Sequence, residues 1–219
     1  MNIMKHENKN STNLPELNNK QNRSKKTYNA FIAACFNLLK KREFDSITVA
    51  YLSQSAGYSV GAFYGRFRSK DELFDAMIAH HLITRRKTTE HLFSTLCADD
   101  IIDELIQDIV YYYRAHQNFW RSALVRSMRD HEFWEPIRQS DHELASRVID
   151  RFSKQANRPL TDLEETNVHF AFQIVLGIIN NTIISKPGPI FLNQKLFVEK
   201  LTQTFRLLTN YDNIISAHS

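Results

Sequence analysis

The sequence predicts an all-α protein of about nine helices, and three observations support this prediction. Apolar residues recur at the spacing of a helical face throughout the chain. No stretch alternates between apolar and polar residues as a half-buried strand does. Glycine and proline are scarce, with five of each in 219 residues, so few positions interrupt a helix. A chain of this length, 42% hydrophobic, can bury a sizeable core in one or two domains.

The first residues predict an arm that precedes the folded chain. Residues 1–22 are polar and rich in asparagine, and they lack the apolar run of a signal peptide. We expect this segment to be flexible. The only cysteines are Cys35 and Cys97, which fits a reducing cytoplasm better than a structural disulfide. After the arm, we expect an N-terminal domain over residues 23–83 and a second helical domain over residues 84–219.

Four helices are predicted in the N-terminal domain. The first runs from about Ser24 to Lys41. Thr48 is the candidate N-cap of the second helix, and Gly57 can take the positive φ that ends it. Ser59 is the candidate N-cap of a third, very short helix that ends near Gly65. Ser69 begins a fourth helix, whose acidic first turn complements the helix dipole and which continues to about Lys87.

The second domain also reads as helices connected by short loops. Thr161 and Glu164 have the spacing of a capping box, so a helix is expected to begin there. The sequence Lys186-Pro-Gly-Pro189 predicts a firm stop. The expected helices run from Asp99-Asp100 to about Arg114, from Asn118 to Met128, from Pro136 to about Ala156, from Thr161 to Ser185, and from the cap Asn193 to about Leu208.

The segment from Thr48 to Phe67 is the most informative part of the chain. Two short helical patterns lie on either side of Ala56-Gly57-Tyr58, which is typical of a helix-turn-helix. The major groove of DNA admits one helix, and this motif places its second helix there. Residues 20–70 carry ten Lys or Arg and two Asp or Glu, whereas residues 71–219 carry sixteen and twenty. This asymmetry predicts an N-terminal end that binds a polyanion, the alternative being chance clustering on a solvated face.

Residues 23–83 resemble the DNA-binding domain of the tetracycline-repressor (TetR) family of bacterial transcription regulators. The resemblance rests on the order and spacing of Thr48-Val49, Leu52, Ala56-Gly57-Tyr58-Ser59, Gly61, Phe63-Tyr64, Phe67 and Ser69-Lys70-Asp71-Glu72-Leu73. The sequence departs from the family pattern at Ser53, Tyr58, Ala62 and Gly65-Arg66. We expect these departures to alter the operator sequence more than the ability to bind DNA.

The resemblance implies which residues contact DNA. Thr48, Tyr64 and Lys70 would contact phosphates, and the segment from Ser59 to Arg66 would face the groove. Each has a structural alternative, since Thr48 is a helix cap in any case, Tyr64 could be packed and Lys70 could be solvated. The complete set of predicted DNA-binding residues is Thr48, Ser59, Val60, Gly61, Ala62, Tyr64, Arg66 and Lys70.

For the second domain, the resemblance implies a ligand-binding domain and a homodimer formed mainly by the last two long helices. The segment 166–185 contains no Asp, Glu, Lys or Arg, which suits either a membrane span or a helix buried in a core or interface. Its Asn and His residues favour burial in protein over a membrane. The predicted interface residues follow helical spacing and are Val168, Phe172, Val175, Ile179, Ile183, Phe197, Leu201, Phe205 and Leu208.

Aromatic residues gather in the middle of the chain. Such a group suits a pocket for a small organic effector, and ordinary core packing is the alternative. Arginines at positions 121, 126, 129 and 138 could balance an acidic ligand or could simply form a solvated face. The candidate ligand-binding residues are Tyr112, His116, Phe119, Trp120, Met128, Trp134 and Phe172.

Enzyme chemistry is not indicated by the sequence. It has no glycine-rich phosphate loop, no Gly-x-Ser-x-Gly and no His-Glu-x-x-His, and its histidines lack metal-ligand spacing. We therefore predict no catalytic activity, no cofactor and no metal. The function expected is a cytoplasmic, ligand-responsive repressor that binds double-stranded DNA at a palindromic operator as a dimer. The alternative is a helical interaction module whose helix-turn-helix no longer binds DNA.

Overall fold

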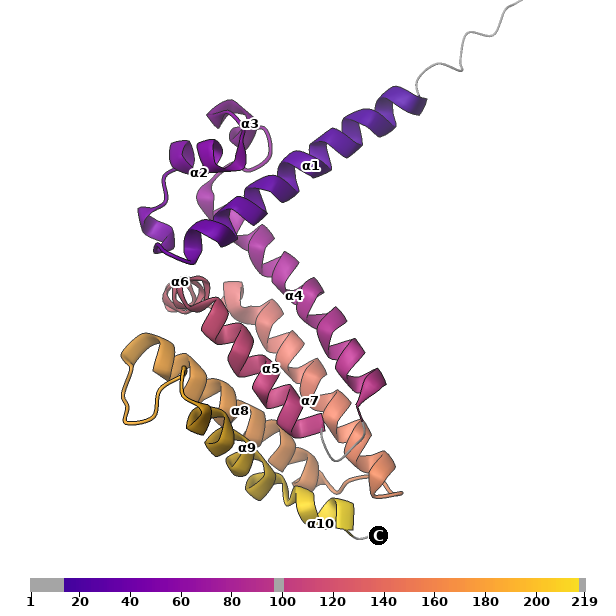
Figure 1. The fold of residues 1–219 in the computed structure, drawn as a ribbon. Helices are drawn as coiled ribbons and strands as arrows, with labels where there is room; N and C mark the ends of the chain where they lie inside the picture. The colour runs from indigo at the N-terminus through magenta and orange to yellow at the C-terminus, as the bar shows by residue number, and fades with distance from the viewer. Residues whose placement is uncertain (1–13, 97–100, 217–219) are drawn as a thin grey trace, which may run out of the picture.

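The computed structural model describes residues 14–96 and 101–216, and it is all-helical over these ranges, as predicted (Figure 1). The described residues form a head, a long connecting helix and a body. The head contains α1 (Leu14–Leu39), the 3-10 helix η1 (Phe44–Ser46), α2 (Val49–Ala56) and α3 (Val60–Tyr64). The connecting helix is α4 (Lys70–Thr95). The body contains α5 (Ile101–Ala115), α6 (Gln117–Ser127), η2 (Glu132–Trp134), α7 (Glu135–Gln155), α8 (Asp162–Ser185), α9 (Lys195–Thr209) and α10 (Tyr211–Ser216).

Two boundaries in the first half of the chain differ from the expectation. Helix α1 begins at Leu14, so the last part of the predicted arm is helical, because neither Gly nor Pro interrupts the chain between Glu16 and Leu39. Helix α4 continues to Thr95 rather than stopping near Lys87. Residues 1–13, Cys97 and Asp99-Asp100, for which predictions were made, lie outside the described residues.

The C-terminal boundary also differs. Gln194, not Asn193, is the N-cap of α9. Asn210 adopts a left-handed conformation, with φ 53°, and ends α9. The chain then forms α10, a short helix that the sequence pattern did not reveal because the apolar spacing continues across this break.

The core of the head is aromatic. Phe31 of α1 is fully buried, and its ring contacts Phe63 and Phe67 edge-on at centroid separations of 5.4 and 6.1 Å. Tyr58, which follows the turn, packs against the same Phe31 ring at 5.7 Å. Cys35 is fully buried in this core, and burial raises the pKa of its thiol to about 12. These contacts fix α2 and α3 against α1.

Ser53 of α2 is a polar residue buried in this core. Its side chain is 1% exposed, and its hydroxyl has no hydrogen-bond partner among the described residues. We expect Ser53→Ala to raise the free energy of unfolding by about 1 kcal/mol, because an unpaired buried hydroxyl is destabilising. Urea denaturation measures the change. Ser55→Ala is the matched control, since Ser55 is exposed on the same helix and gains the same helix propensity. A loss of stability in Ser53→Ala would contradict this assignment.

Helix α8 is the central helix of the body. Among the described helices, it alone has the length and composition of a membrane span. It packs against α6, α7 and α9, and Val175 and Ile179 on its inner face are fully buried. The capping box predicted at its start is present, with the Thr161 hydroxyl accepting from the Glu164 amide and the Glu164 carboxylate accepting from the Thr161 amide. These contacts describe a core helix of a helical body.

Candidate nucleic-acid interface and ligand cavity

The turn between α2 and α3 has the geometry of a helix-turn-helix. Gly57 ends α2 with φ 75°, a conformation that strongly favours glycine. The Tyr58 amide donates to the Ser53 carbonyl at 2.9 Å and closes the end of α2. Ser59 then begins α3, because its hydroxyl oxygen accepts from the Ala62 amide at 3.1 Å. Both caps predicted from the sequence are therefore formed.

Helix α3 presents most of its side chains to solvent. Phe63 is fully buried and anchors the helix, while Val60 and Tyr64 are 41% and 57% exposed. The Tyr64 ring touches Phe63 edge-on at 5.3 Å, so one edge of the ring is packed and the hydroxyl end is free to reach a ligand. Ser59, Gly61 and Arg66 are also exposed, and Ala62 is half-buried.

Thr48 begins α2 on the same head. Its hydroxyl oxygen accepts from the Tyr51 amide at 3.1 Å, which makes it the helix cap. The side chain is exposed, and the hydroxyl hydrogen remains available for a further acceptor. Capping and a phosphate contact are therefore compatible at this residue.

Lys70 has an intramolecular role that the sequence pattern did not show. Its ammonium group donates to the Phe44 carbonyl at 2.9 Å and lies 4.7 Å from the centre of the Phe44 ring. Lys70 therefore holds η1 against the first turn of α4. An additional basic group in this area is Arg42, which lies over the Tyr51 ring at 5.0 Å and was not among the predicted residues.

The head is fastened to the body through α6. The Asn118 amide donates to the Leu39 carbonyl at the end of α1, at 2.8 Å. Arg126 pairs with Asp75 of α4 at 2.8 Å and also donates to the Asp71 carbonyl. Burial raises the pKa of Asp75 even though Arg126 lies beside it. Movement of α6 or α4 in the body is thus linked to the position of the head.

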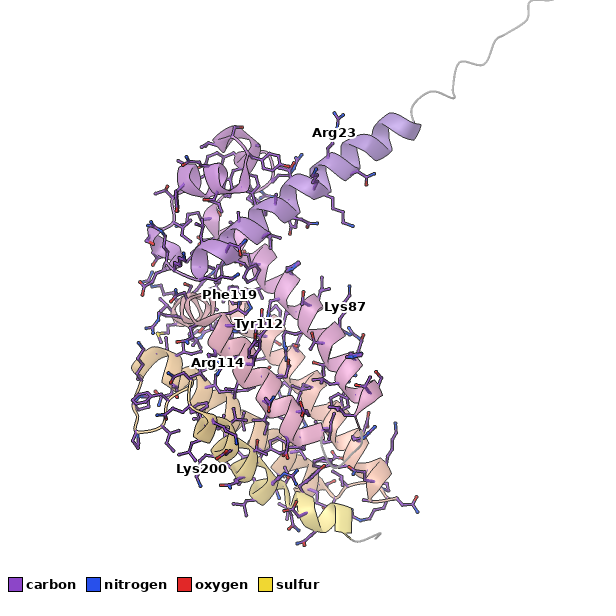
Figure 2. The ribbon with its side chains drawn as sticks, viewed as in Figure 1. Arg23, Lys87, Tyr112, Arg114, Phe119 and Lys200 are labelled. Carbon is purple, nitrogen blue, oxygen red and sulfur yellow. The ribbon has the colours of Figure 1, made fainter. Side chains whose placement is uncertain are left out.

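The body contains a cavity of about 220 Å³ between α4, α5 and α7, with α6 and α8 completing its wall. Tyr112 and Trp120, both predicted ligand residues, line it. Figure 2 shows Tyr112 and Phe119 within the body near the head, and Lys87 on the outer side of α4. The full lining is His81, Leu82, Arg85, Arg86, Thr89, Glu90, Ile109, Tyr112, Tyr113, Trp120, Ile137, Ser140, Asp141, Glu143, Leu144, Arg147 and Leu176.

The other predicted ligand residues do not line this cavity. Met128 is 66% exposed at the end of α6, outside this cavity. Phe172 is buried against Phe205 of α9, with ring centres 5.0 Å apart. His116 packs between Phe36 and Tyr112, and Phe119 and Trp134 contact Trp120 from behind. Apart from the exposed Met128, these residues pack into the core around the cavity, because sequence neighbours on a helix point in different directions.

Two polar groups, the buried His81 and the half-buried Asp141, give the cavity its electrostatic character. His81 has Nδ1 2.7 Å from the Tyr112 hydroxyl, and burial lowers its pKa to about 3, so the ring is neutral. Burial raises the pKa of Asp141 to about 7. Arg85 is ion-paired with Asp108 and lies over the Tyr112 ring at 5.0 Å. The sequence held a signal for Asp141, since it occupies the helical stripe of α7 that otherwise contains Ile137, Ala145 and Val148.

The residues predicted for the dimer interface lie mostly inside the single chain. Eight of the nine are buried inside the single chain, with Val168, Val175 and Phe205 at 0–1% exposure, and Leu208 is half-buried. Their helical spacing marks the inner face, which packs α8 against α9 within one body. Other apolar side chains on the outer faces of α8 and α9 are exposed, namely Leu163, Phe170, Ile178, Leu196 and Leu207.

The described residues contain no group of three or more His, Cys, Asp or Glu side chains that could hold a metal ion. One pair of histidine rings lies close together, His142 of α7 and His169 of α8, with centres 5.6 Å apart. Two ligands do not complete a structural metal site.

The comparisons with known sequences agree with the helix-turn-helix geometry. Residues 31–77 match the profile described as bacterial regulatory proteins, tetR family. The HTH-type transcriptional regulator YwcC of Bacillus subtilis (strain 168) is 50% identical over 46 residues, which are 21% of this chain and 21% of YwcC. The HTH-type transcriptional regulator YvdT of the same organism is 25% identical over 161 residues, which are 71% of this chain and 79% of YvdT.

Solved structures share the fold over nearly the whole chain. GusR of Salmonella enterica superposes with a TM-score of 0.59 at 16% identity, covering 93% of this chain and 100% of GusR. RolR, solved in complex with resorcinol, superposes with a TM-score of 0.56 at 14% identity, covering 90% of this chain and 96% of RolR. Residues 31–77 therefore carry a helix-turn-helix domain that matches the tetR family of bacterial regulatory proteins, and the chain shares the two-part helical fold of these solved structures.

Proposed function

We propose that this chain is a ligand-responsive repressor that binds a palindromic operator as a homodimer in the cytoplasm. The observation that carries the proposal is the exposed face of α3, held by the buried Phe63 beside the exposed cap Thr48. A helix anchored by one side and exposed on the other can enter a major groove. The basic residues of the head supply attraction to phosphate.

The dimer is proposed to use the outer faces of α8 and α9. Phe170 and Ile178 are 49% and 40% exposed on α8, and Leu207 is 82% exposed on α9. The exposed α8 face carries no charged residue between Thr166 and Ser185, and open space surrounds Gly177, where a partner helix can approach closely. Two such faces related by a two-fold axis would place two heads on one operator.

In this proposal, ligand binding in the cavity regulates the affinity of the heads for DNA. Its wall includes His81 and Arg85 of α4, the helix whose first residue, Lys70, holds η1 of the head. A ligand that favours one position of α4 would change the separation of the two heads and so the affinity for DNA. Coupling of this kind is typically about 1–3 kcal/mol. The resorcinol complex of RolR supports the general idea, as a neighbour of the same fold holds a small aromatic compound.

The DNA-binding proposal can be tested by gel shift with DNA from immediately upstream of the coding region, and by selection from genomic fragments. We expect binding to fall about 10³–10⁵-fold between 50 and 200 mM salt, as for roughly 6–10 phosphate contacts. Arg66→Ala and Tyr64→Phe should each weaken binding. If Arg66 contacts a phosphate, its removal should reduce the salt slope by about one.

Lys87→Ala is the matched control for these variants, because Lys87 is exposed on α4 away from the head. It should leave both affinity and salt slope unchanged. Lys70→Ala is less informative, since it also releases η1. A protein that shifts no duplex at low salt, and enriches no genomic fragment, would contradict the proposal and favour an interaction module.

A further inference from the structure

The size of the cavity limits the ligand to a small molecule. An apolar cavity of about 150 Å³ accepts benzene, and this cavity measures about 220 Å³. The additional volume suits one aromatic ring with a short substituent. Tyr112, Tyr113 and Trp120 form one part of the wall, with Tyr113 stacked on Trp120 at a ring separation of 4.3 Å and an interplanar angle of 11°. This part of the wall favours a flat, apolar group.

Asp141 is the polar feature of this wall that lacks a partner. It lies one turn after Ile137 on α7 and lines the cavity. No hydrogen bond or ion pair reaches its carboxyl from any described residue, and it is half-buried where the other acidic residues of the lining, Glu90 and Glu143, are exposed. Burial raises its pKa to about 7 because no neighbouring cation offsets the loss of water. A carboxylate in this position requires a counter-ion that the chain does not supply.

The basic residues around the cavity already have partners. Arg85 pairs with Asp108, and Arg86 pairs with Glu90 at 3.3 Å. Arg147 lies over the Phe93 ring at 4.7 Å. An acidic ligand would have to compete for these groups and would also meet Asp141. A basic ligand would gain an unpaired carboxylate and the faces of aromatic rings, which attract cations.

We propose that the cavity binds a protonated amine carried by a single aromatic ring, with the carboxylate of Asp141 as its counter-ion. The inference rests on the proposed function only in treating the cavity as the effector site. The ring would lie against the Tyr113 and Trp120 walls, and the ammonium group would donate hydrogen bonds to Asp141. Glu143, which is exposed at the rim two residues further along α7, stays solvated.

The proposal is tested by calorimetric titration of the whole protein, without DNA, with three probes of similar shape. They are phenethylamine, 2-phenylethanol and phenylacetate, which differ in charge. At pH 8, where Asp141 is ionised, we expect phenethylamine to bind most tightly and phenylacetate most weakly. Asp141→Asn should weaken phenethylamine binding by about tenfold or more and change 2-phenylethanol binding little. Glu143→Gln, the matched control, should change phenethylamine binding by less than about threefold.

Several outcomes would overturn the proposal. They are tighter binding of phenylacetate than of phenethylamine, equal binding of phenethylamine by Asp141→Asn and by the wild type, or no binding of any probe at millimolar concentration. Gel shifts are measured separately. A protein that binds phenethylamine but no DNA would leave this inference standing and refute the proposed repressor. A protein that binds its operator but binds phenylacetate more tightly than phenethylamine would refute this inference and leave the proposed repressor standing.

Discussion

Replacing Phe170 by glutamate is expected to convert the proposed dimer into monomers and to weaken operator binding by about 10²–10⁴-fold. The side chain is 49% exposed on the outer face of α8, so the substitution removes no contact of the internal core. In a dimer it would bury two carboxylates at a two-fold axis, where unpaired charge is strongly unfavourable. Each monomer would then contact the operator through one head only. It would lose the gain in affinity that comes from the high effective concentration of a second, linked head.

Sedimentation equilibrium and gel shift measure these two effects. Ile83→Glu is the matched control, because Ile83 is 60% exposed on α4 and the chemical change is the same. The control should remain dimeric and bind DNA normally. A Phe170→Glu protein that stays dimeric with wild-type affinity would show that the subunits associate elsewhere, or that one head is sufficient.

The head was largely predictable from the sequence because its signals are local. Thr48, Gly57, Ser59 and Ser69 act within three residues of their own position, through caps or through a required backbone conformation. These interactions do not depend on contacts with distant parts of the chain. Lys70 shows the limit, since its partner carbonyl at Phe44 is 26 residues away, and spacing along one helix cannot reveal it.

The proposed dimer face was not predictable in the same way. Helical periodicity identifies the apolar stripe of α8, but a helix that is apolar on nearly all sides has no single stripe. Val175 and Ile178 are three residues apart, yet the first is fully buried and the second is 40% exposed. Only the packing of α8 against α9 decides which side remains for a partner. The residues of α8 predicted for the interface are the ones that this packing buries inside the chain.

The cavity raises a related difficulty. Aromatic residues were expected to mark the ligand site, and Tyr112 and Trp120 do line the cavity. Phe119, equally aromatic and adjacent in sequence, is fully buried core. The informative residues were polar ones within apolar stripes, His81 on α4 and Asp141 on α7. Because burying such groups is costly, their presence on an inner face is a better indicator of a site than another aromatic ring.

Because burying a carboxylate is costly, Asp141→Asn tests the stability of the protein as well as ligand binding. An unfolded aspartate titrates near 3.8, and burial raises the pKa of Asp141 to about 7 in the folded protein. Between these values the folded protein keeps a proton that the unfolded chain has released. Stability therefore falls as pH rises through this range, and the full loss is present above pH 7. His81 stays neutral in this range, because burial lowers its pKa to about 3.

Asparagine has a similar shape and does not titrate. The stability of Asp141→Asn relative to the wild type should therefore grow with pH. We expect Asp141→Asn to be more stable than the wild type by less than about 1 kcal/mol near pH 5 and by roughly 2 kcal/mol at pH 8, values reduced from the full shift because the carboxyl borders a cavity. Urea denaturation at four pH values from 5 to 8 measures the difference. Glu143→Gln, on the exposed rim, should show no such trend. An advantage that is the same at every pH would mean that Asp141 is already ionised at pH 5, and that the cavity supplies it with a counter-charge or water. A growing advantage would mean that the protein tolerates an unstable carboxylate here, as expected where the stabilising partner is a ligand.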